Sequence, residues 1–329
     1  MNERMTMMSK PVLFVSFRPL ERAENLRAIY DAYPGPKVHK HTYDKDYKTE
    51  VTSGKYDLMV IDEFPNVTPG KCIMIWHGIQ GGKTIGLDQP GTPYYEPYQA
   101  DLMTYIISAG TGMVNVWSEC TAVPRERILP LGMPRTDEYT AYKHEPNKQT
   151  TYLFVPTFRD LEDTPFPQID WAYLNDHLTD NEVLVVKAHP WQEFHGMTNQ
   201  VTPGLVNGMY KHIAIVSPAG PTTPFLYNAD VVITDYSSIM FDAYLLDKPV
   251  VLFEKTPGYT FSRGMYLDYP SQYCSYSATE ECVLLDTMRY RARHPFLTET
   301  EKRCRTVVAD MCDGHACERL ISLINDLNK

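Results

Sequence analysis

The triplet Trp76-His77-Gly78 places a titratable imidazole in a glycine-rich turn. The apolar run 72–75 precedes the triplet, and the polar stretch 79–84, which contains Lys83, follows it. Histidine is the usual general base for deprotonating a hydroxyl near neutral pH, and glycine lets a substrate approach the backbone closely. His77 is therefore a candidate general base. For any single histidine, the alternative is a packed ring that bonds a neighbouring carbonyl.

A second group of polar residues, Asp235-Tyr236-Ser237-Ser238, follows the apolar run 231–234 and opens a predicted helix. The first turn of a helix leaves backbone N–H groups unpaired, and the helix dipole favours negative charge there. Two serine hydroxyls add further donors. These residues are candidates for binding a phosphate. The alternative is a helix N-cap with no ligand, because Ser and Asp are common cap residues.

Two more predicted strands in the same half of the chain end in basic or hydroxyl side chains. Thr157 and Arg159 follow the strand predicted at 151–155, and Lys187-Ala188-His189-Pro190 follows the one at 182–187. Arginine pairs well with phosphate oxygens. Three strand ends with anion-binding groups favour phosphate recognition over a simple cap. His189 lies in the opposite half of the chain from His77, and a cleft between two domains could bring the two rings together.

Two other motifs are weaker. Residues 78–84 nearly match the P-loop pattern, but His77 stands where the first glycine belongs. The Walker-B-like run 58–63 precedes that loop instead of following it, which disfavours an NTPase. The cluster Cys304, Cys312, His315 and Cys317 lacks a paired Cys-x2-Cys spacing and lies in a helical segment, so an inert role is favoured over zinc. We expect no metal and no cofactor.

Short apolar runs alternating with helical segments predict an α/β fold with mostly parallel sheets. Helices are expected at 25–32, 99–107, 171–178, 238–246, 299–311 and 315–327. The polar segment 142–150 is the predicted linker. It separates an N-terminal Rossmann-like, acceptor-side domain (1–145) from a C-terminal Rossmann-like, nucleotide-donor domain (146–329). Whether the C-terminal helices pack back on the first domain is left open. Ligands of such sheets bind at the carboxyl ends of the strands, so the two sheets are expected to face each other across a cleft.

Composition argues against a nucleic-acid-binding protein and against a membrane-spanning one. The net charge of -10 argues against non-specific nucleic-acid binding. No apolar stretch reaches transmembrane length, and the first ten residues lack the apolar core of a signal peptide. We therefore expect a cytoplasmic protein.

Taken in order, these motifs resemble the CDP-glycerol glycerophosphotransferases, the teichoic-acid primase and polymerase family. The resemblance runs over most of the chain. Its markers are LFVSF (13–17) with NLRAIY (25–30), Trp76-His77-Gly78 with Lys83 and Gly86, LGMPRTD (131–137), VPTFRD (155–160), KAHP (187–190), TDYSS (234–238), Phe241-Asp242 and Lys248-Pro249. Each motif is short, but their shared order is specific.

The resemblance implies a GT-B-like fold and transfer of glycerol phosphate from CDP-glycerol, or a related CDP-alditol, to an acceptor hydroxyl with release of CMP. It implies no obligatory metal. By the same resemblance His77 takes the acceptor proton, and His189 stabilises or protonates the departing phosphate. Residues Thr157, Arg159, Asp235, Ser237 and Ser238 are placed at the donor phosphates, and Gly78, Lys83 and Arg135 on the acceptor side.

The turn after His77 is one residue longer than the family's familiar form, which leaves the acceptor open. A teichoic-acid-like or capsule-like polymer, its linkage unit and a lipid-linked saccharide all fit. Peripheral contact with the inner face of the cell membrane is open too. Two other functions remain. One is a GT-B glycosyltransferase using a nucleotide-sugar, and the other is a non-catalytic protein that binds a nucleotide or polymer.

Overall fold

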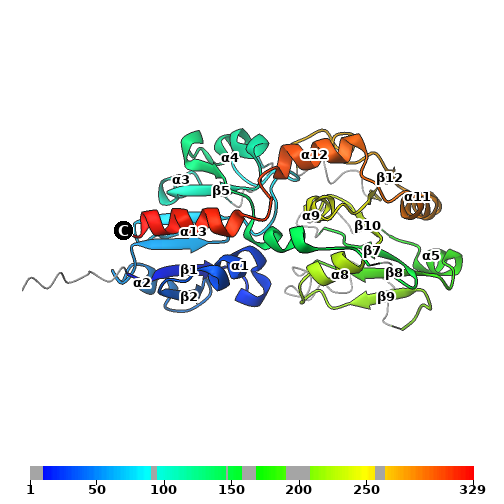
Figure 1. Cartoon of the computed structure of the whole chain (residues 1–329), viewed down its shortest axis with the longest axis horizontal. Coiled ribbons are helices and arrows are strands. Elements are labelled where there is room, and N and C mark those ends of the chain that lie inside the picture. Colours follow the sequence, from blue (N-terminus) through cyan, green and yellow to red (C-terminus); the bar gives the residue numbers. More distant parts are fainter. Residues whose placement is uncertain (1–9, 90–94, 146, 158–167, 190–207, 256–263) are drawn as a thin grey trace, which may run out of the picture. The chain divides into compact units, whose positions relative to one another are not determined.

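The computed structural model describes residues 10–89, 95–145, 147–157, 168–189, 208–255 and 264–329 (Figure 1). The chain forms two compact units. The first comprises Met1–Gly78, Tyr94–Glu138 and Asp310–Lys329, and the second comprises Ile79–Pro93 and Tyr139–Ala309. The chain therefore enters the second unit directly after Gly78, before it returns to complete the first.

The first unit is built on a six-stranded parallel sheet in the order β2-β1-β3-β4-β5-β6. Two of its strands, β1 and β3, are buried along their whole length and are apolar except for Ser16, as expected for a parallel sheet covered on both faces. The strands are β1 (Val12–Ser16), β2 (Lys37–His41), β3 (Leu58–Ile61), β4 (Lys71–Ile75), β5 (Tyr105–Ser108) and β6 (Ile128–Pro130).

The helices of the first unit are short, apart from the one at the end of the chain. They are η1 (Leu20–Arg22), α1 (Glu24–Ala32), α2 (Tyr47–Val51), α3 (Gln99–Leu102), η2 (Thr111–Met113), α4 (Val114–Thr121), η3 (Arg125–Arg127) and α13 (Ala316–Leu327). The 3-10 helix η4 (Pro134–Ala141) carries the chain into the second unit.

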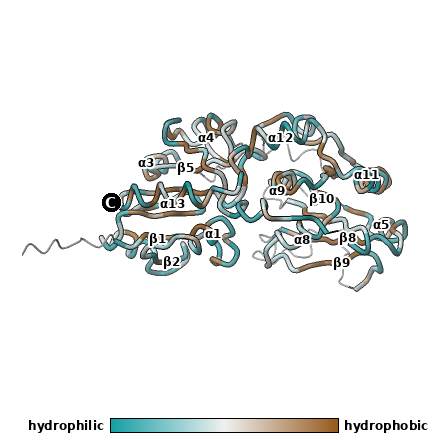
Figure 2. The backbone as a smooth tube through the Cα atoms, viewed as in Figure 1, coloured by the Kyte–Doolittle hydropathy of each residue, from teal (hydrophilic) through white to brown (hydrophobic). Residues whose placement is uncertain are grey.

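Helix α13 is amphipathic. Its buried residues Ala316, Leu320 and Ile324 are spaced by four, which places them on one face of the helix. Figure 2 shows hydrophobic and hydrophilic colour alternating along this helix. The helix packs against α1, so it covers part of the core of the first unit.

The second unit has its own six-stranded parallel sheet, in the order β12-β11-β10-β7-β8-β9. Its strands are β7 (Thr150–Phe154), β8 (Glu182–Lys187), β9 (Ile213–Val216), β10 (Val231–Thr234), β11 (Val250–Phe253) and β12 (Ser277–Ala278). Its helices are α5 (Trp171–His177), α8 (Thr223–Asn228), α9 (Ile239–Leu245), α11 (Glu281–Arg293) and α12 (Glu299–Ala309).

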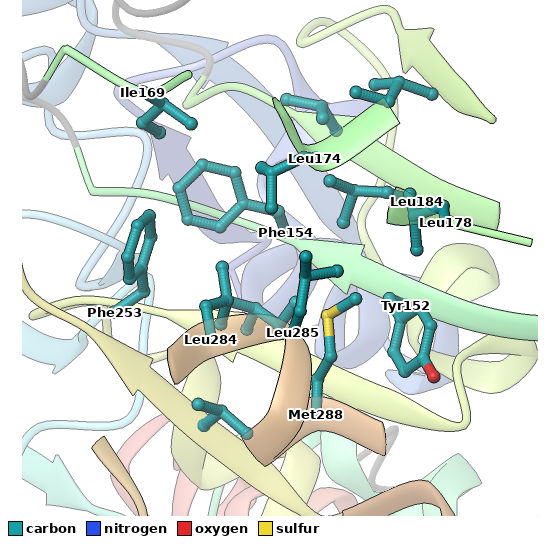
Figure 3. Close-up of a cluster of buried hydrophobic side chains, with 14 of the residues drawn as sticks. Tyr152, Phe154, Ile169, Leu174, Leu178, Leu184, Phe253, Leu284, Leu285 and Met288 are labelled. Atoms are coloured by element: carbon teal, nitrogen blue, oxygen red, sulfur yellow. The ribbon is translucent and has the colours of Figure 1, made fainter. Parts of the chain in front are cut away.

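The core of the second unit lies between the sheet and its covering helices. In Figure 3, Leu285 and Met288 of α11 point toward the strand residues Phe154 and Tyr152, and Leu174 of α5 joins the same cluster. Each fully buried side chain of this kind contributes about 1.5–3 kcal/mol. The cluster therefore fixes the strands whose carboxyl ends carry the predicted phosphate-binding residues.

The strand order marks a switch point in each sheet. In the second sheet the crossovers reverse direction between β7 and β10, and in the first they reverse between β1 and β3. Open α/β sheets bind ligands beyond the carboxyl ends of the strands at such points. Thr157 and Asp235 follow β7 and β10, so two of the predicted site residues lie at the switch point of the second sheet.

Two parts of the chain differ from the sequence-based expectation. The helix expected at 99–107 is only the short α3, and its second half is the strand β5. The segment 142–150, expected as a linker, begins within the second unit. There the Tyr142 hydroxyl donates to the carbonyl of Tyr227, and His144 Nε2 lies 3.0 Å from Asp230 Oδ1.

Candidate active site

His77 lies just beyond the carboxyl end of β4, in the turn predicted from its motif. Its ring is half-buried, and Nδ1 lies 3.0 Å from Oε1 of Glu63. Glu63 comes two residues after the neighbouring strand β3, so the parallel register of the two strands brings the side chains together. No described residue bonds to Nε2, which leaves this nitrogen as the one that can take a proton from a substrate.

Electrostatics suit His77 for that role. Burial lowers the pKa of His77, while the nearby Glu63 carboxylate acts in the opposite direction. The net lowering keeps the ring neutral at neutral pH, which is the form a general base needs. The carboxylate also favours the tautomer that carries its proton on Nδ1.

Two buried side chains fix the backbone of the turn. Asn25 Nδ2 donates to the carbonyl of Trp76 at 2.9 Å, and Arg135 Nη1 donates to the carbonyl of His77 at 2.7 Å. Asn25 also accepts a bond from the backbone N–H of Arg135. Arg135, which the sequence places on the acceptor side, thus holds the turn that carries the candidate base.

Aromatic packing restrains the His77 ring as well. Trp76 is buried, with its ring centroid 4.4 Å from that of His77. Phe64 and Trp117 pack against the Trp76 ring in turn. The imidazole therefore has little freedom to turn away from Glu63.

Asp62, next to Glu63 in sequence, has a different environment. It is 1% exposed, and Oδ1 accepts the backbone N–H of Phe17 at 2.9 Å. Burial, aided by the charge of Glu63, raises the pKa of Asp62 to about 7. These two carboxylates belong to the run 58–63 that looked Walker-B-like, and no pattern in the sequence indicated that Glu63 would meet His77.

In the second unit, Asp235 organises the switch point through backbone bonds. Its Oδ1 accepts the N–H groups of Thr157 and Tyr236, both at 2.7 Å, and the side chain is 2% exposed. This carboxylate ties the end of β7 to the end of β10. It thereby fixes the position of the Thr157 backbone.

Lys83 belongs to this second group of residues. The family resemblance places it with Gly78 on the acceptor side; in the structure Gly78 closes a segment of the first unit and Lys83 lies in the second. Lys83 Nζ donates to Thr157 Oγ1 at 2.5 Å. Lys83 and Thr157 are thus brought together at the switch point of the second sheet.

Ser237 and Ser238 precede α9. Ser238 makes no side-chain capping bond to the helix, and Ser237 Oγ accepts the N–H of Ile239 at a long 3.4 Å. The cap alternative therefore accounts for at most one of the two hydroxyls. His189 follows β8 and its neighbour Lys187 is buried, with Nζ donating to the carbonyl of Pro218. Arg159 lies outside the described residues.

Among the described residues, no group of three or more His, Cys, Asp or Glu side chains is arranged to hold a metal ion. Two cysteines of the predicted C-terminal cluster have backbone partners. Cys312 Sγ contacts the carbonyl of Ala109, and Cys317 Sγ contacts that of Pro134. Within the same described part of the chain, no helix is long and apolar enough to span a membrane.

Comparison with known proteins decides the family. Residues 51–326 match the family model described as CDP-glycerol:poly(glycerophosphate) glycerophosphotransferase. The chain belongs to this family. The resemblance inferred from the motifs is therefore confirmed, and the match covers both units.

Several curated relatives are teichoic-acid enzymes. The poly(ribitol-phosphate) polymerase of Bacillus spizizenii is 27% identical over 241 residues, which are 64% of this chain and 38% of the relative. The glycerol-phosphate primase of Bacillus subtilis is 24% identical over 280 residues, which are 78% of this chain and 68% of the relative. Matches to the first three relatives span between 38% and 58% of their lengths.

Solved structures agree on the fold. The wall teichoic acid polymerase TagF superposes with a TM-score of 0.73 at 20% identity, covering 97% of this chain and 89% of that one. The Staphylococcus aureus MnaA–UDP structure gives a TM-score of 0.58 at 13% identity, covering 96% of each chain. The predicted GT-B-like α/β fold class is confirmed by these likenesses together with the two parallel sheets.

Proposed function

We propose that this member of the glycerophosphotransferase family transfers glycerol phosphate from CDP-glycerol to an acceptor hydroxyl and releases CMP. The observation that carries the proposal is the environment of the His77 ring. Its Nδ1 lies against Glu63, and no described residue bonds to its Nε2. The family match and the teichoic-acid primase relatives support the same donor class. A TagF structure soaked with CDPG has a TM-score of 0.73 with this chain and supports a nucleotide donor for the fold.

In the proposed reaction, Nε2 of His77 accepts the acceptor's hydroxyl proton as that oxygen attacks the phosphorus bonded to glycerol. A new P–O bond forms to the acceptor, and the bond from this phosphorus to the bridging oxygen breaks. The electron pair of the broken bond leaves on CMP. Glu63 stabilises the imidazolium that forms on His77, because its carboxylate faces the protonated Nδ1.

The second unit holds the donor in this proposal. Thr157, Ser237 and Ser238 supply hydroxyl donors near the ends of β7 and β10, and His189 lies after β8, next to β7. Hydrogen-bond donors placed in advance near transferring phosphoryl groups stabilise the charge that develops in the transition state. His189 would stabilise or protonate the departing CMP.

The test is nucleotide release from CDP-glycerol, CDP-ribitol and UDP-sugars, each supplied with polymer and lipid-linked saccharide acceptors. Wild type is compared with His77→Ala and with His315→Ala. His315 is a matched control because its side chain is 64% exposed and its ring pairs only locally, with Glu318. Calorimetric donor binding is measured for each protein.

CMP release from CDP-glycerol that disappears in His77→Ala, with donor binding kept and His315→Ala active, is the expected result. Normal turnover by His77→Ala would show that His77 is not the general base. UDP release in place of CMP would make the protein a nucleotide-sugar glycosyltransferase. Donor binding without turnover on any acceptor would favour the non-catalytic alternative.

A further inference from the structure

The segment that follows the candidate base is fastened to the second unit. Three hydrogen bonds hold its backbone: Tyr273 OH to Gly81 O at 2.8 Å, Tyr266 N to Gly82 O at 3.0 Å, and Thr84 N to Gly264 O at 3.2 Å. Lys83 also forms an antiparallel bridge with Met265. The backbone on both sides of Lys83 is therefore held by residues of the same unit.

The surroundings of Gly81 show how closely this segment packs against the second unit. Its φ is +152°, and a Cβ built there would lie 2.6 Å from Cγ1 of Val308 and 3.3 Å from the Phe241 ring. Phe241 belongs to α9 and Val308 to α12, both in the second unit. A side chain at Gly81 would force the segment off these helices, so the position of Lys83 depends on that glycine.

The head group of Lys83 lies where ligands of such a sheet bind. Its Nζ bonds Thr157 Oγ1, and the backbone of Thr157 is fixed by Asp235 from the neighbouring strand end. Those two strands flank the switch point, beyond which open α/β sheets hold phosphorylated ligands. Lys83 carries a positive charge and Thr157 a hydroxyl, and both kinds of group bind phosphate oxygens in proteins.

We propose that Lys83 binds the diphosphate of the nucleotide donor together with Thr157, and that it has no part in holding the acceptor. The inference rests on the proposed function for the identity of the donor. It means that the segment after His77 contacts the donor, although this segment directly follows the candidate base in the sequence. Lysine binds phosphate as a point charge, so the contact depends on charge more than on side-chain shape.

The test measures affinity without acceptor for cytidine, CMP and CDP-glycerol. Lys83→Met is expected to weaken CDP-glycerol binding at least tenfold and leave cytidine binding unchanged, while Lys83→Arg recovers most of the loss. Lys211→Met is the matched control. This lysine has the same charge, is 68% exposed, and precedes the edge strand β9 of the same sheet, away from the switch point.

Two results would overturn the inference. In the first, Lys83→Met binds every nucleotide ligand as tightly as wild type but has a raised KM for the acceptor. Lys83 would then belong to the acceptor side. The other is equal weakening for cytidine and CDP-glycerol with a lowered Tm, which would make Lys83 a structural residue.

The donor assignment can fail separately. If wild type prefers a UDP-sugar, the same comparison is made with uridine and that donor. A loss confined to the diphosphate ligand then sustains the role of Lys83 while the proposed function falls. Wild type that binds no nucleotide would overturn both proposals.

Discussion

Nδ1 of His77 lies 3.0 Å from Oε1 of Glu63, and the two residues follow neighbouring parallel strands of one sheet. A carboxylate at this position does two separable things. As a polar neighbour of Nδ1 it orients the ring, and as a negative charge it stabilises the imidazolium. Replacing it by an amide or by a methyl group distinguishes the two effects.

We expect Glu63→Gln to lower turnover about 10-fold and Glu63→Ala roughly 100-fold, because only glutamine keeps a polar oxygen beside Nδ1. The base must be neutral, so activity rises as the pH rises through the pKa of His77. Burial already lowers that pKa, and losing the Glu63 charge lowers it further. The acidic limb of the kcat profile should therefore move to lower pH in both variants. A limb that stays in place would contradict this coupling.

Asp62→Asn should make stability less sensitive to pH. Burial raises the folded-state pKa of Asp62 from 3.8 to about 7, so the folded protein loses stability as the pH rises between those values. Asparagine has no proton to lose and can still accept from Phe17. Thermal unfolding should show little difference near pH 4 and a gain on the order of a few kcal/mol at pH 8. Asp57→Asn, an exposed carboxylate of the same unit, is the control.

Gly132→Ala should destabilise the protein far more than Gly54→Ala. Both glycines have positive φ, +84° and +76°. An added Cβ at Gly132 would lie 2.2 Å from the carbonyl oxygen of Met311, whereas nothing lies within 4 Å of one at Gly54. Left-handed backbone alone costs about 1–2 kcal/mol, and the clash adds about 1–3 kcal/mol at Gly132. Equal losses in denaturant unfolding would mean that the Met311 segment moves aside freely.

Asp137→Ala should loosen the last helix. The carboxylate of Asp137 accepts the backbone N–H groups of Ala316 and Cys317, at 2.9 and 2.8 Å, and so caps α13 from a distant part of the chain. Loss of such a cap costs about 1 kcal/mol. Hydrogen exchange should be faster in α13 of this variant and unchanged in the exposed neighbour variant Glu138→Ala. If α13 exchanged at the same rate in Asp137→Ala as in Glu138→Ala, Asp137 would not act as a cap of this helix.

Continuous apolar runs made most of the strands predictable from the sequence. Residues 231–233 and 250–253 are uninterrupted apolar runs, and both belong to buried strands. Strand β2 was missed because its sequence KVHKH is mostly polar and every residue in it is half-buried, as suits an edge. The run 99–107 failed for another reason, since a short apolar segment fits a strand or a helix equally well by periodicity.

The candidate site also contains residues that local motifs predict and residues whose placement depends on the tertiary structure. His77, Ser237 and Ser238 belong to local motifs, so their positions at strand ends followed from the sequence. The partnership of Glu63 with His77 depends on which strands are neighbours, and short-range patterns do not encode that. The placement of Lys83 beside Thr157 depends on a segment that leaves one unit for the other, which short-range patterns do not encode either.

The return of residues 310–329 to the first unit has a consequence for synthesis on the ribosome. Domains usually fold as they emerge, the N-terminal one first. Here the face of α1 that α13 covers has no partner until the whole second unit has been translated. The unit that starts first is therefore completed last, once residues 316–327 of α13 have been made.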